Sequence, residues 1–290
     1  MALVAVAVVT DTTSYLPSDL AEANRIHLVS LYVVFGGERT VREADITDYD
    51  AFFEELRGAD KLPTTSQPSI GDFIEVWEPL LARGDDVVSI HISGGISGTV
   101  QSAQQAAEQL QRDGKGGDRV RVLDSATSAG GLGLMALAAA HEAAKGSSLD
   151  DVATTATEAR ESLKMWFAID TLEFLKRSGR IGGASAWLGS ALKIKPILTL
   201  ESEMTPVERV RTSKRAFERM VDYARQRNDS DMNAWVVQHI QAPDQAAALA
   251  ERCREVFGHD AVFTSEIGPV LGAHTGPGLL GVGSVHERFV

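Results

Sequence analysis

The first part of the chain alternates between short apolar runs and longer stretches in which apolar residues recur every three or four positions. The apolar runs, which are rich in β-branched residues, lie at 2–9, 27–35, 87–92 and 120–123. The helical stretches lie at 48–56, 70–82, 103–111 and 129–145. Apolar strands that alternate with helices are typical of a parallel sheet covered by helices on both faces. We therefore predict an α/β/α domain that spans residues 1–160.

The second part of the chain continues the alternation after a connecting helix expected at 149–163. Further strands are expected at 166–169, 194–200, 203–210, 235–239 and 262–266. Helices are expected at 213–227 and 244–257, with a short one near residue 172. These elements predict a second, smaller α/β domain at residues 161–290. A length of 290 residues agrees with two domains, because a single hydrophobic core rarely grows beyond about 250–300 residues.

Charge and cysteine content exclude several classes of protein. A net charge of −12, without a Lys- and Arg-rich stretch extensive enough to form a basic face, argues against a nucleic-acid binder. Cys253 is the only cysteine, which excludes intramolecular disulfides and cysteine-based zinc sites. The apolar start has no basic segment before it, and no apolar run reaches the ~20 residues that span a bilayer. We therefore expect a soluble, cytoplasmic protein that begins with a strand.

The segment 93–102, Ser-Gly-Gly-Ile-Ser-Gly-Thr-Val-Gln-Ser, joins an apolar strand to a helix. Its glycines let the backbone turn sharply and approach a bound group, and the amides at the helix start point outward as donors. This pattern is suited to holding an anion. The alternative, which such a loop favours when taken alone, is a plain strand-to-helix connection whose hydroxyls cap the helix.

Two further loops carry polar residues with a candidate binding role. Three consecutive hydroxyls, Thr64, Thr65 and Ser66, lie between prolines and precede the helix at 70–82. His274 lies in the glycine-rich segment 268–278, among residues too small to bury it. The hydroxyls and the imidazole are candidate ligand-binding groups.

The short helix near residue 172 ends in a basic tip, formed by Lys176, Arg177 and Arg180. Cations at a helix C-terminus are favoured by the helix dipole. The same charges suit the acidic surface of a partner protein. The sequence leaves both interpretations open.

The three loops 64–69, 93–99 and 272–278 together resemble the DegV family of fatty-acid-binding proteins. Segments 9–11, 170–181 and 195–198 also match, so the resemblance covers nearly the whole chain. Members usually have glycine in place of Ala44. The resemblance implies a DegV-like fold in which the parallel-sheet domain and a smaller mixed-sheet domain enclose one long-chain fatty acid. The fatty-acid-binding residues that it implies are Thr65, Ser97 and His274, with Thr64, Ser66, Ser93 and Gly98 beside them.

The resemblance also implies a carrier and not an enzyme. A DegV protein presents a palmitate- or oleate-like acid to a separate bacterial fatty acid kinase, which converts the carboxylate to an acyl phosphate for phospholipid synthesis. Docking on that kinase is then the role expected of Arg180, Arg177 and Lys176. We expect no cofactor, no metal, no nucleic acid and no integral membrane segment.

The chemistry of the candidate residues is compatible with a carrier. Burying on the order of fourteen methylenes at ~0.8 kcal/mol each gives roughly 11 kcal/mol, against about 1 kcal/mol for a neutral hydrogen bond. The tail then supplies affinity and the loops supply placement. Hydroxyls and amides hold a carboxylate without a fixed cation, which leaves the head group free enough to be passed on.

A serine hydrolase is the alternative function. The pentapeptide Gly-Ile-Ser-Gly-Thr resembles the G-x-S-x-G nucleophile elbow, with Thr99 in place of the last glycine. Ser97 would be the nucleophile and His274 the base, with Asp11, Asp170 or another carboxylate orienting the base. A phosphosugar or nucleotide binder is a third class, but the chain lacks a Walker lysine and metal-binding carboxylates.

Overall fold

The computed structural model describes residues 4–59, 61–188 and 194–290. The first sheet, sheet A, is parallel throughout, in the order β2-β1-β6-β7. Its strands are β1 Val6–Asp11, β2 Ile26–Val29, β6 Asp86–His91 and β7 Val120–Asp124. The predicted parallel sheet is therefore confirmed, while the first positions expected in β1, residues 2 and 3, lie outside the described residues.

Helices cover both faces of sheet A. They are α1 Ser18–Ala23, α3 Ile70–Ala82, α4 Thr99–Arg112, α5 Ala129–Ala144 and α6 Leu149–Ser162. α3 and α4 pack on one face through Phe73, Trp77 and Ala103. α3 begins where predicted because Ser69 and Asp72 form a capping box. α5 lies on the opposite face and contacts β1 and β6.

The second part of the chain forms sheet C, in the order β10-β9-β8-β13-β11-β12. Its strands are β8 Lys164–Ala168, β9 Lys195–Glu201, β10 Glu203–Val210, β11 Ala234–His239, β12 Phe263–Glu266 and β13 Leu280–Val285. Neighbouring strands are antiparallel except for the parallel pair β11 and β12, so the expected mixed sheet is confirmed. The helices α8 Ser213–Asn228 and α9 Pro243–Phe257 cover its outer face.

β13 lies inside sheet C, although its sequence did not predict a strand. Gly281 and Gly283 lower its strand propensity. Close packing requires both glycines, because a Cβ on Gly281 would lie 3.0 Å from Cβ of Phe167 and one on Gly283 would collide with Met165. The hydrophobic pattern cannot predict a strand whose glycines are required by packing against a neighbouring strand.

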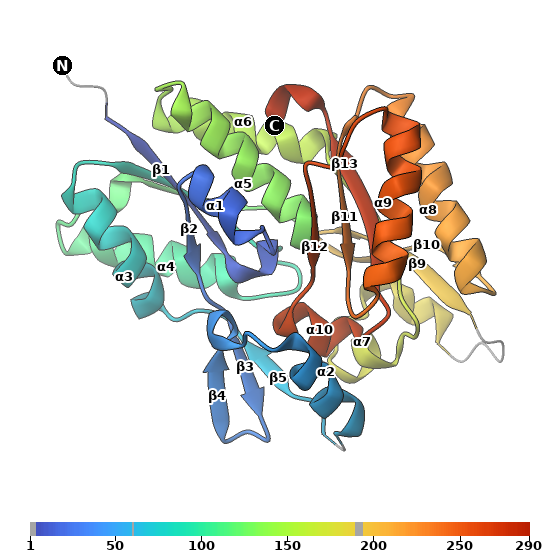
Figure 1. Cartoon of the computed structure of the whole chain (residues 1–290). Helices are drawn as coiled ribbons and strands as arrows, with labels where there is room; N and C mark the ends of the chain where they lie inside the picture. The colour runs from blue at the N-terminus through green and yellow to red at the C-terminus, as the bar shows by residue number, and fades with distance from the viewer. Residues whose placement is uncertain (1–3, 60, 189–193) are drawn as a thin grey trace.

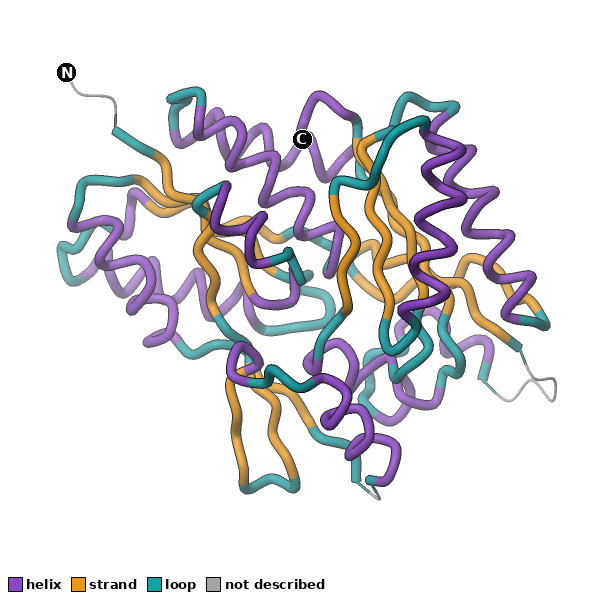
Figure 2. Tube along the Cα trace, in the orientation of Figure 1, coloured by secondary structure: helices purple, strands orange, loops and turns teal. Residues whose placement is uncertain are grey.

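α5 is shared by sheets A and C (Figure 2). It is buried from Ala129 to Ala140 and contacts β1 and β6 on one side and β11 and β13 on the other. Val8 and Ile90 of sheet A and Val236 of sheet C belong to one continuous core with it. The layers therefore run from α3 and α4 through sheet A, α5 and sheet C to α8 and α9 (Figure 1).

The strand expected at 27–35 is wrong, because this run forms two strands in different sheets. β2 ends at Val29, after which Leu31 donates its amide to Thr12 Oγ1 and accepts from the Glu43 amide. The strands β3 Tyr32–Phe35, β4 Arg39–Arg42 and β5 Thr64–Ser66 then form the antiparallel sheet B, in the order β4-β3-β5. The apolar run continues across this break because both strands have a buried face.

Shorter elements complete the fold. They are α2 Tyr49–Gly58, α7 Glu173–Arg177, α10 Pro269–Thr275, η1 Thr12–Ser14, η2 Glu43–Asp45, η3 Gly117–Arg119, η4 Gly182–Trp187 and η5 Glu287–Phe289. Two segments that the sequence indicated as loops thus have regular structure: residues 64–66 form β5, and much of 268–278 is α10. Pro269 at the first helical position favours the start of α10.

The first turn of α5 is capped from sheet C. The Ser128 side chain makes no cap bond, and the Gly130 amide donates to Oε1 of Gln238 on β11. Nε2 of Gln238 donates to Ser265 Oγ at 2.9 Å, so both ends of this buried amide are satisfied. This contact ties the shared helix to sheet C.

The domain boundary expected at residues 160 and 161 stays a prediction. It falls near the end of α6, which contacts β6 and β7 of sheet A and also β13 of sheet C. Among the described residues, we found no helix that is long and apolar enough to cross a membrane.

Candidate functional site

A cavity lies between the inner face of sheet C, the first residues of α5, sheet B and α10. It holds about 970 Å³ of space free of protein atoms, its open mouth included. Its walls are largely apolar, with Ile92, Met165, Leu200, Met204 and Leu279 among them. Ligand pockets combine apolar walls with a few placed polar groups. This lining indicates a site for a small molecule with a substantial apolar part.

Polar residues from three distant segments meet in this cavity. They are Thr65 and Ser66 on β5, Ser97 and Gly98 before α4, and His274 on α10. The segments come together because β5 pairs with β3, α4 starts after β6, and α10 packs on sheet B and α2. The structure therefore brings five of the expected binding residues into one lining.

Thr64 and Ser93, which were also expected at the binding site, do not line this cavity. Thr64 is exposed, and its side chain leaves β5 on the face opposite to Thr65. Ser93 is fully buried, where its Oγ donates to the Ser202 carbonyl at 2.6 Å and accepts from the Gly95 amide at 3.2 Å. Ser93 thus holds the glycine turn against the connection between β9 and β10.

A hydrogen bond of 2.7 Å joins His274 Nε2 to Thr65 Oγ1. Burial, reinforced by the positive charge of Arg180, lowers the pKa of His274 from 6.5 to about 4, so the imidazole is neutral near pH 7. Its Nδ1 is buried and has no hydrogen-bond partner within the described ranges. The tautomer with the proton on Nε2 donates to Thr65 and leaves the Thr65 hydroxyl hydrogen available to a ligand.

Ser97 and Thr99 form a pair of hydroxyls at the start of α4. Their oxygens lie 2.8 Å apart, and Ser97 Oγ also accepts from the Thr99 amide at 3.3 Å. Gly98 is the N-cap of α4, and a Cβ there would lie 3.1 Å from Gln67 Nε2. Glycine at this position therefore lets the turn lie close to β5. The positive end of the α4 dipole favours an anion at the same place.

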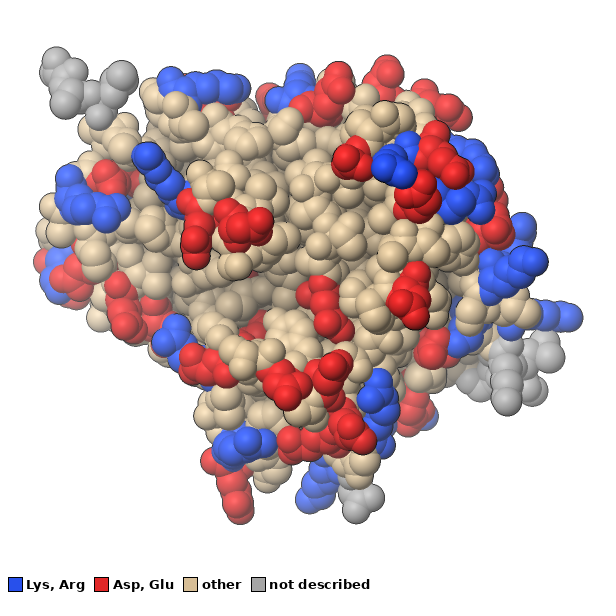
Figure 3. Space-filling view, viewed as in Figure 1, with Lys and Arg blue, Asp and Glu red and all other residues tan. Residues whose placement is uncertain are grey.

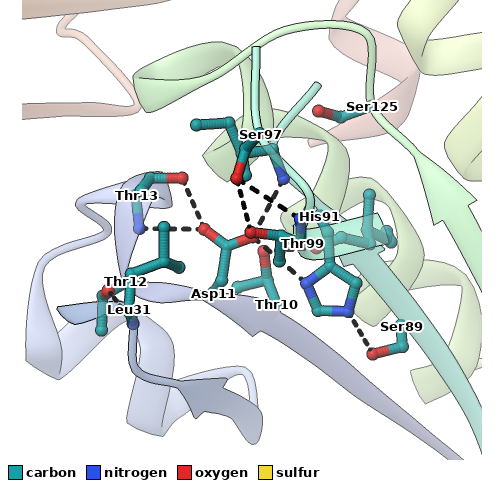
Figure 4. A network of polar contacts seen from close by, with 12 residues as sticks. Thr10, Asp11, Thr12, Thr13, Leu31, Ser89, His91, Ser97, Thr99 and Ser125 are labelled. Carbon is teal, nitrogen blue, oxygen red and sulfur yellow. Dashed lines mark hydrogen bonds and ion pairs between the residues drawn. The ribbon is translucent and has the colours of Figure 1, made fainter. Parts of the chain in front are cut away.

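A buried polar network anchors the turn that carries Ser97 (Figure 4). Asp11, at the end of β1, accepts from the Ile92 amide at 2.9 Å and from the Thr13 amide at 3.0 Å. His91 Nδ1 lies 3.1 Å from the Asp11 carboxylate, and His91 Nε2 lies 2.7 Å from Ser89 Oγ. Ser89, His91 and Asp11 have the order of a catalytic triad, but all three are fully buried and line no part of this cavity. We infer a structural role for them.

Arg180 also lines the cavity, which the sequence did not indicate. Its Nη1 donates to the Ser178 carbonyl at 2.7 Å, and the side chain is exposed. Gly179 allows the chain to turn toward the cavity, since its φ of +73° favours glycine. The expectation of a site without a fixed cation is therefore wrong. Lys176 and Arg177, the other residues of the basic tip, are exposed on α7 and do not line the cavity.

In the described part of the chain, the expected nucleophile Ser97 and the expected base His274 are not hydrogen-bonded to each other. Ser97 bonds to Thr99, and His274 bonds to Thr65. No carboxylate orients His274, because its Nδ1 is unpartnered there. The candidate orienters are engaged elsewhere: Asp11 bonds to His91, and Asp170 pairs with Lys195 at 2.5 Å. A hydrolase needs both contacts.

The surface carries charges of both signs (Figure 3). On the face shown, Asp and Glu side chains gather over α2, where Asp48, Asp50, Glu54 and Glu55 are exposed. Among the residues that the structure describes, we found no group of His, Cys, Asp or Glu side chains arranged to hold a metal ion.

Fold and cavity together define an α/β protein in which a parallel and a mixed sheet share a buried helix beside a largely apolar ligand cavity. The model of a family described as "Uncharacterised protein, DegV family" matches residues 5–287. The chain belongs to the DegV family.

Individual relatives match over almost their whole length. A DegV domain-containing protein of Streptomyces coelicolor is 40% identical over 280 residues, which cover 96% of this chain and 97% of the relative. Protein DegV of Bacillus subtilis is 37% identical over 287 residues, which cover 96% of this chain and 98% of the relative. The resemblance noted in the sequence is thus confirmed.

Solved structures of the family have the same fold. A DegV family protein of Thermus thermophilus, described by its fatty acid binding, gives a TM-score of 0.88 at 36% identity, covering 97% of this chain and 99% of that one. DegV of Bacillus subtilis, described as a fatty acid binding protein, gives a TM-score of 0.87 at 36% identity, covering 98% of this chain and all of that one.

Proposed function

We propose that this chain binds a long-chain fatty acid in the cavity and presents its carboxylate to a separate fatty acid kinase. The supporting observation is the lining, in which largely apolar walls surround the Ser97 hydroxyl and a Thr65 hydroxyl that is hydrogen-bonded to His274. The solved relatives at 36% identity are described as fatty acid binding.

The head group is assigned to Thr65 and Ser97, with His274 behind them. His274 donates to Thr65, whose hydroxyl then donates to one carboxylate oxygen, and Thr99 donates to Ser97, whose hydroxyl donates to the other. Ser66 and Gly98 lie beside these groups. Each hydrogen bond to a charged group contributes about 1.5–3 kcal/mol, so the apolar tail remains the larger source of affinity.

The kinase partner belongs to the same proposal. Docking is assigned to the basic tip, Lys176, Arg177 and Arg180, where positive charge suits an acidic partner surface. Because Arg180 also lines the cavity, it would lie beside both the carboxylate and the kinase. The acyl phosphate would serve phospholipid synthesis, and the need for ATP places the reaction in the cytoplasm. The chain itself then needs no cofactor.

Extraction of the purified protein tests the binding step. We expect about one equivalent of a long-chain fatty acid by mass spectrometry, and saturable binding of palmitate or oleate after delipidation. Octanoate is the matched ligand control, since each methylene that it lacks removes ~0.8 kcal/mol of apolar burial. Failure of the delipidated protein to bind either long-chain acid refutes the proposed function.

A second assay separates the carrier from a serine hydrolase. A carrier gives neither a burst nor turnover with chromogenic esters, and it supports acyl phosphate formation when a fatty acid kinase and ATP are added. His274→Gln keeps a hydrogen-bond donor while removing proton transfer, so a carrier retains much of its function and a hydrolase loses nearly all of it. Ester cleavage by the parent that is lost in His274→Gln contradicts the carrier assignment.

A further inference from the structure

Glu43 is a carboxylate that has no role in the head group site described above. It lies in η2, is only 3% exposed, and forms no ion pair among the described residues. Three donors converge on it instead: Thr12 Oγ1 at 2.5 Å, the Tyr15 hydroxyl at 2.7 Å and the Val270 amide at 2.8 Å. Burial of a carboxylate without a cation is unfavourable, so a compensating function for this cluster is expected.

The cluster caps the helix that carries His274. α10 begins after Gly268, which has no side chain with which to cap it, so its first amides need acceptors from elsewhere. Val270 donates its amide to Glu43 Oε1, and Leu271 donates its amide to the Tyr15 hydroxyl at 3.2 Å. The Tyr15 hydroxyl in turn donates a hydrogen bond to Glu43. Both helix amides are therefore connected to one carboxylate, one directly and one through Tyr15.

α10 packs closely against Tyr49 and Phe53 of α2, so small changes in its orientation change its contacts. A Cβ on Gly268 would lie 2.6 Å from the Tyr49 hydroxyl, and a Cβ on Gly272 would lie 2.5 Å from Cζ of Phe53. His274 follows Val270 by about one helical turn, and both residues line the cavity. A tilt at the capped end therefore moves the imidazole relative to Thr65.

We propose that Glu43, with Tyr15, is a positioning residue that fixes α10 so that the His274 imidazole meets Thr65 at the head group site. The inference rests on the proposed function for its effect on ligand affinity. The effect on the imidazole itself is independent of any ligand.

Tyr15→Phe and Glu43→Gln test this role. Tyr15→Phe keeps the ring but removes the acceptor of the Leu271 amide and one donor to Glu43. Glu43→Gln keeps the shape of the side chain but replaces the oxygen that accepts from the Thr12 hydroxyl with an NH2 group, which donates. Tyr223→Phe is the matched control, because the Tyr223 hydroxyl is buried in the core between sheet C and α8 and has no hydrogen-bond partner among the described residues. Glu142→Gln is the control for the second variant, since Glu142 pairs with Lys145 on the surface.

Two readouts are needed, one in the free protein and one with palmitate. In the delipidated protein, NMR titration of the His274 ring should show its pKa moving from about 4 toward 6.5 in both test variants and staying in place in both controls. With palmitate, the dissociation constant should rise on the order of tenfold in the test variants alone. Thermal denaturation of all four variants records any loss of folding.

The outcomes separate the two proposals. An unchanged His274 titration in folded Tyr15→Phe and Glu43→Gln overturns the positioning role, whatever happens to affinity. A shifted titration with unchanged palmitate affinity supports the positioning of His274 by Glu43 and refutes its expected effect on ligand affinity. If the parent binds no palmitate, the proposed function fails while the titration still decides whether Glu43 positions His274.

Discussion

Replacing Thr65 with valine tests the head group assignment most directly. Valine has nearly the same shape and favours a strand, so β5 and its pairing with β3 are retained. The substitution removes the hydroxyl that lies 2.7 Å from His274 Nε2 and with it the proposed donor to the carboxylate. It therefore changes the chemistry of the site without changing its volume.

The effect on affinity follows from the bond that is lost. A hydrogen bond to a charged group contributes about 1.5–3 kcal/mol, and 1.4 kcal/mol corresponds to a factor of ten in the dissociation constant. We therefore expect palmitate to bind about 10- to 100-fold more weakly. Binding should persist, because the tail contributes roughly 11 kcal/mol before association costs. His274 loses its partner in the free and the loaded protein alike, which lowers folding stability by about 1 kcal/mol.

Titration of the delipidated protein with palmitate, together with thermal denaturation, separates the two effects. Thr64→Val is the matched control, because Thr64 is the neighbouring residue on β5 but does not line the cavity. It should leave the dissociation constant unchanged. A Thr65→Val protein that loses stability but keeps the parent's affinity would refute the assignment, since Thr65 would then serve His274 alone.

Three further predictions concern the kinase reaction and the pH dependence. Ser97→Ala should weaken palmitate binding about as much as Thr65→Val, and at saturating palmitate it should lower the rate of acyl phosphate formation on the order of tenfold or more through a misplaced carboxylate. Full turnover would leave Ser97 as a helix cap only. Arg180→Glu and Lys176→Glu should both raise the Michaelis constant for the carrier; because Lys176 lies outside the cavity, its variant should keep the parent's palmitate affinity, and two unchanged constants would reject docking. Because the pKa of His274 is lowered to about 4 in the fold, the unfolded chain takes up the proton first, so stability present above about pH 6.5 should fall toward pH 4. Denaturant midpoints of His274→Gln should lack this contribution, and parallel curves for the two proteins would contradict burial of the imidazole.

Elements with a strong local signal could be predicted from the sequence. α3 has an apolar face and a capping box next to it, so both its identity and its start were predictable. Prediction failed where an element depends on contacts with distant residues. Nothing in the run 27–35 indicates that Leu31 bonds to Thr12 and Glu43 instead of continuing β2. β13 was missed for a related reason, since its glycines are required by close packing against side chains on β8.

The candidate site shows the same division. Unusual runs of hydroxyls and glycines indicated Thr65 and Ser97, but side-chain direction depends on strand register, so the sequence could not separate Thr65 from Thr64. The position of Arg180 depends on the turn at Gly179 and on how α7 packs against α10. The role of Glu43 could not be predicted from the sequence, because the Val270 amide that it caps is 227 positions away.

The shared helix also limits how a fatty acid can reach the cavity. If sheets A and C swung apart like a clam shell, α5 would expose Leu132, Leu134 and Met135, which are now at most 2% exposed. Each such side chain costs about 1.5–3 kcal/mol to bring into water. We therefore expect a fatty acid to enter and leave without separation of the two sheets, while α5 stays buried between them. We expect the α5 amides to exchange hydrogen slowly in both the free and the loaded protein.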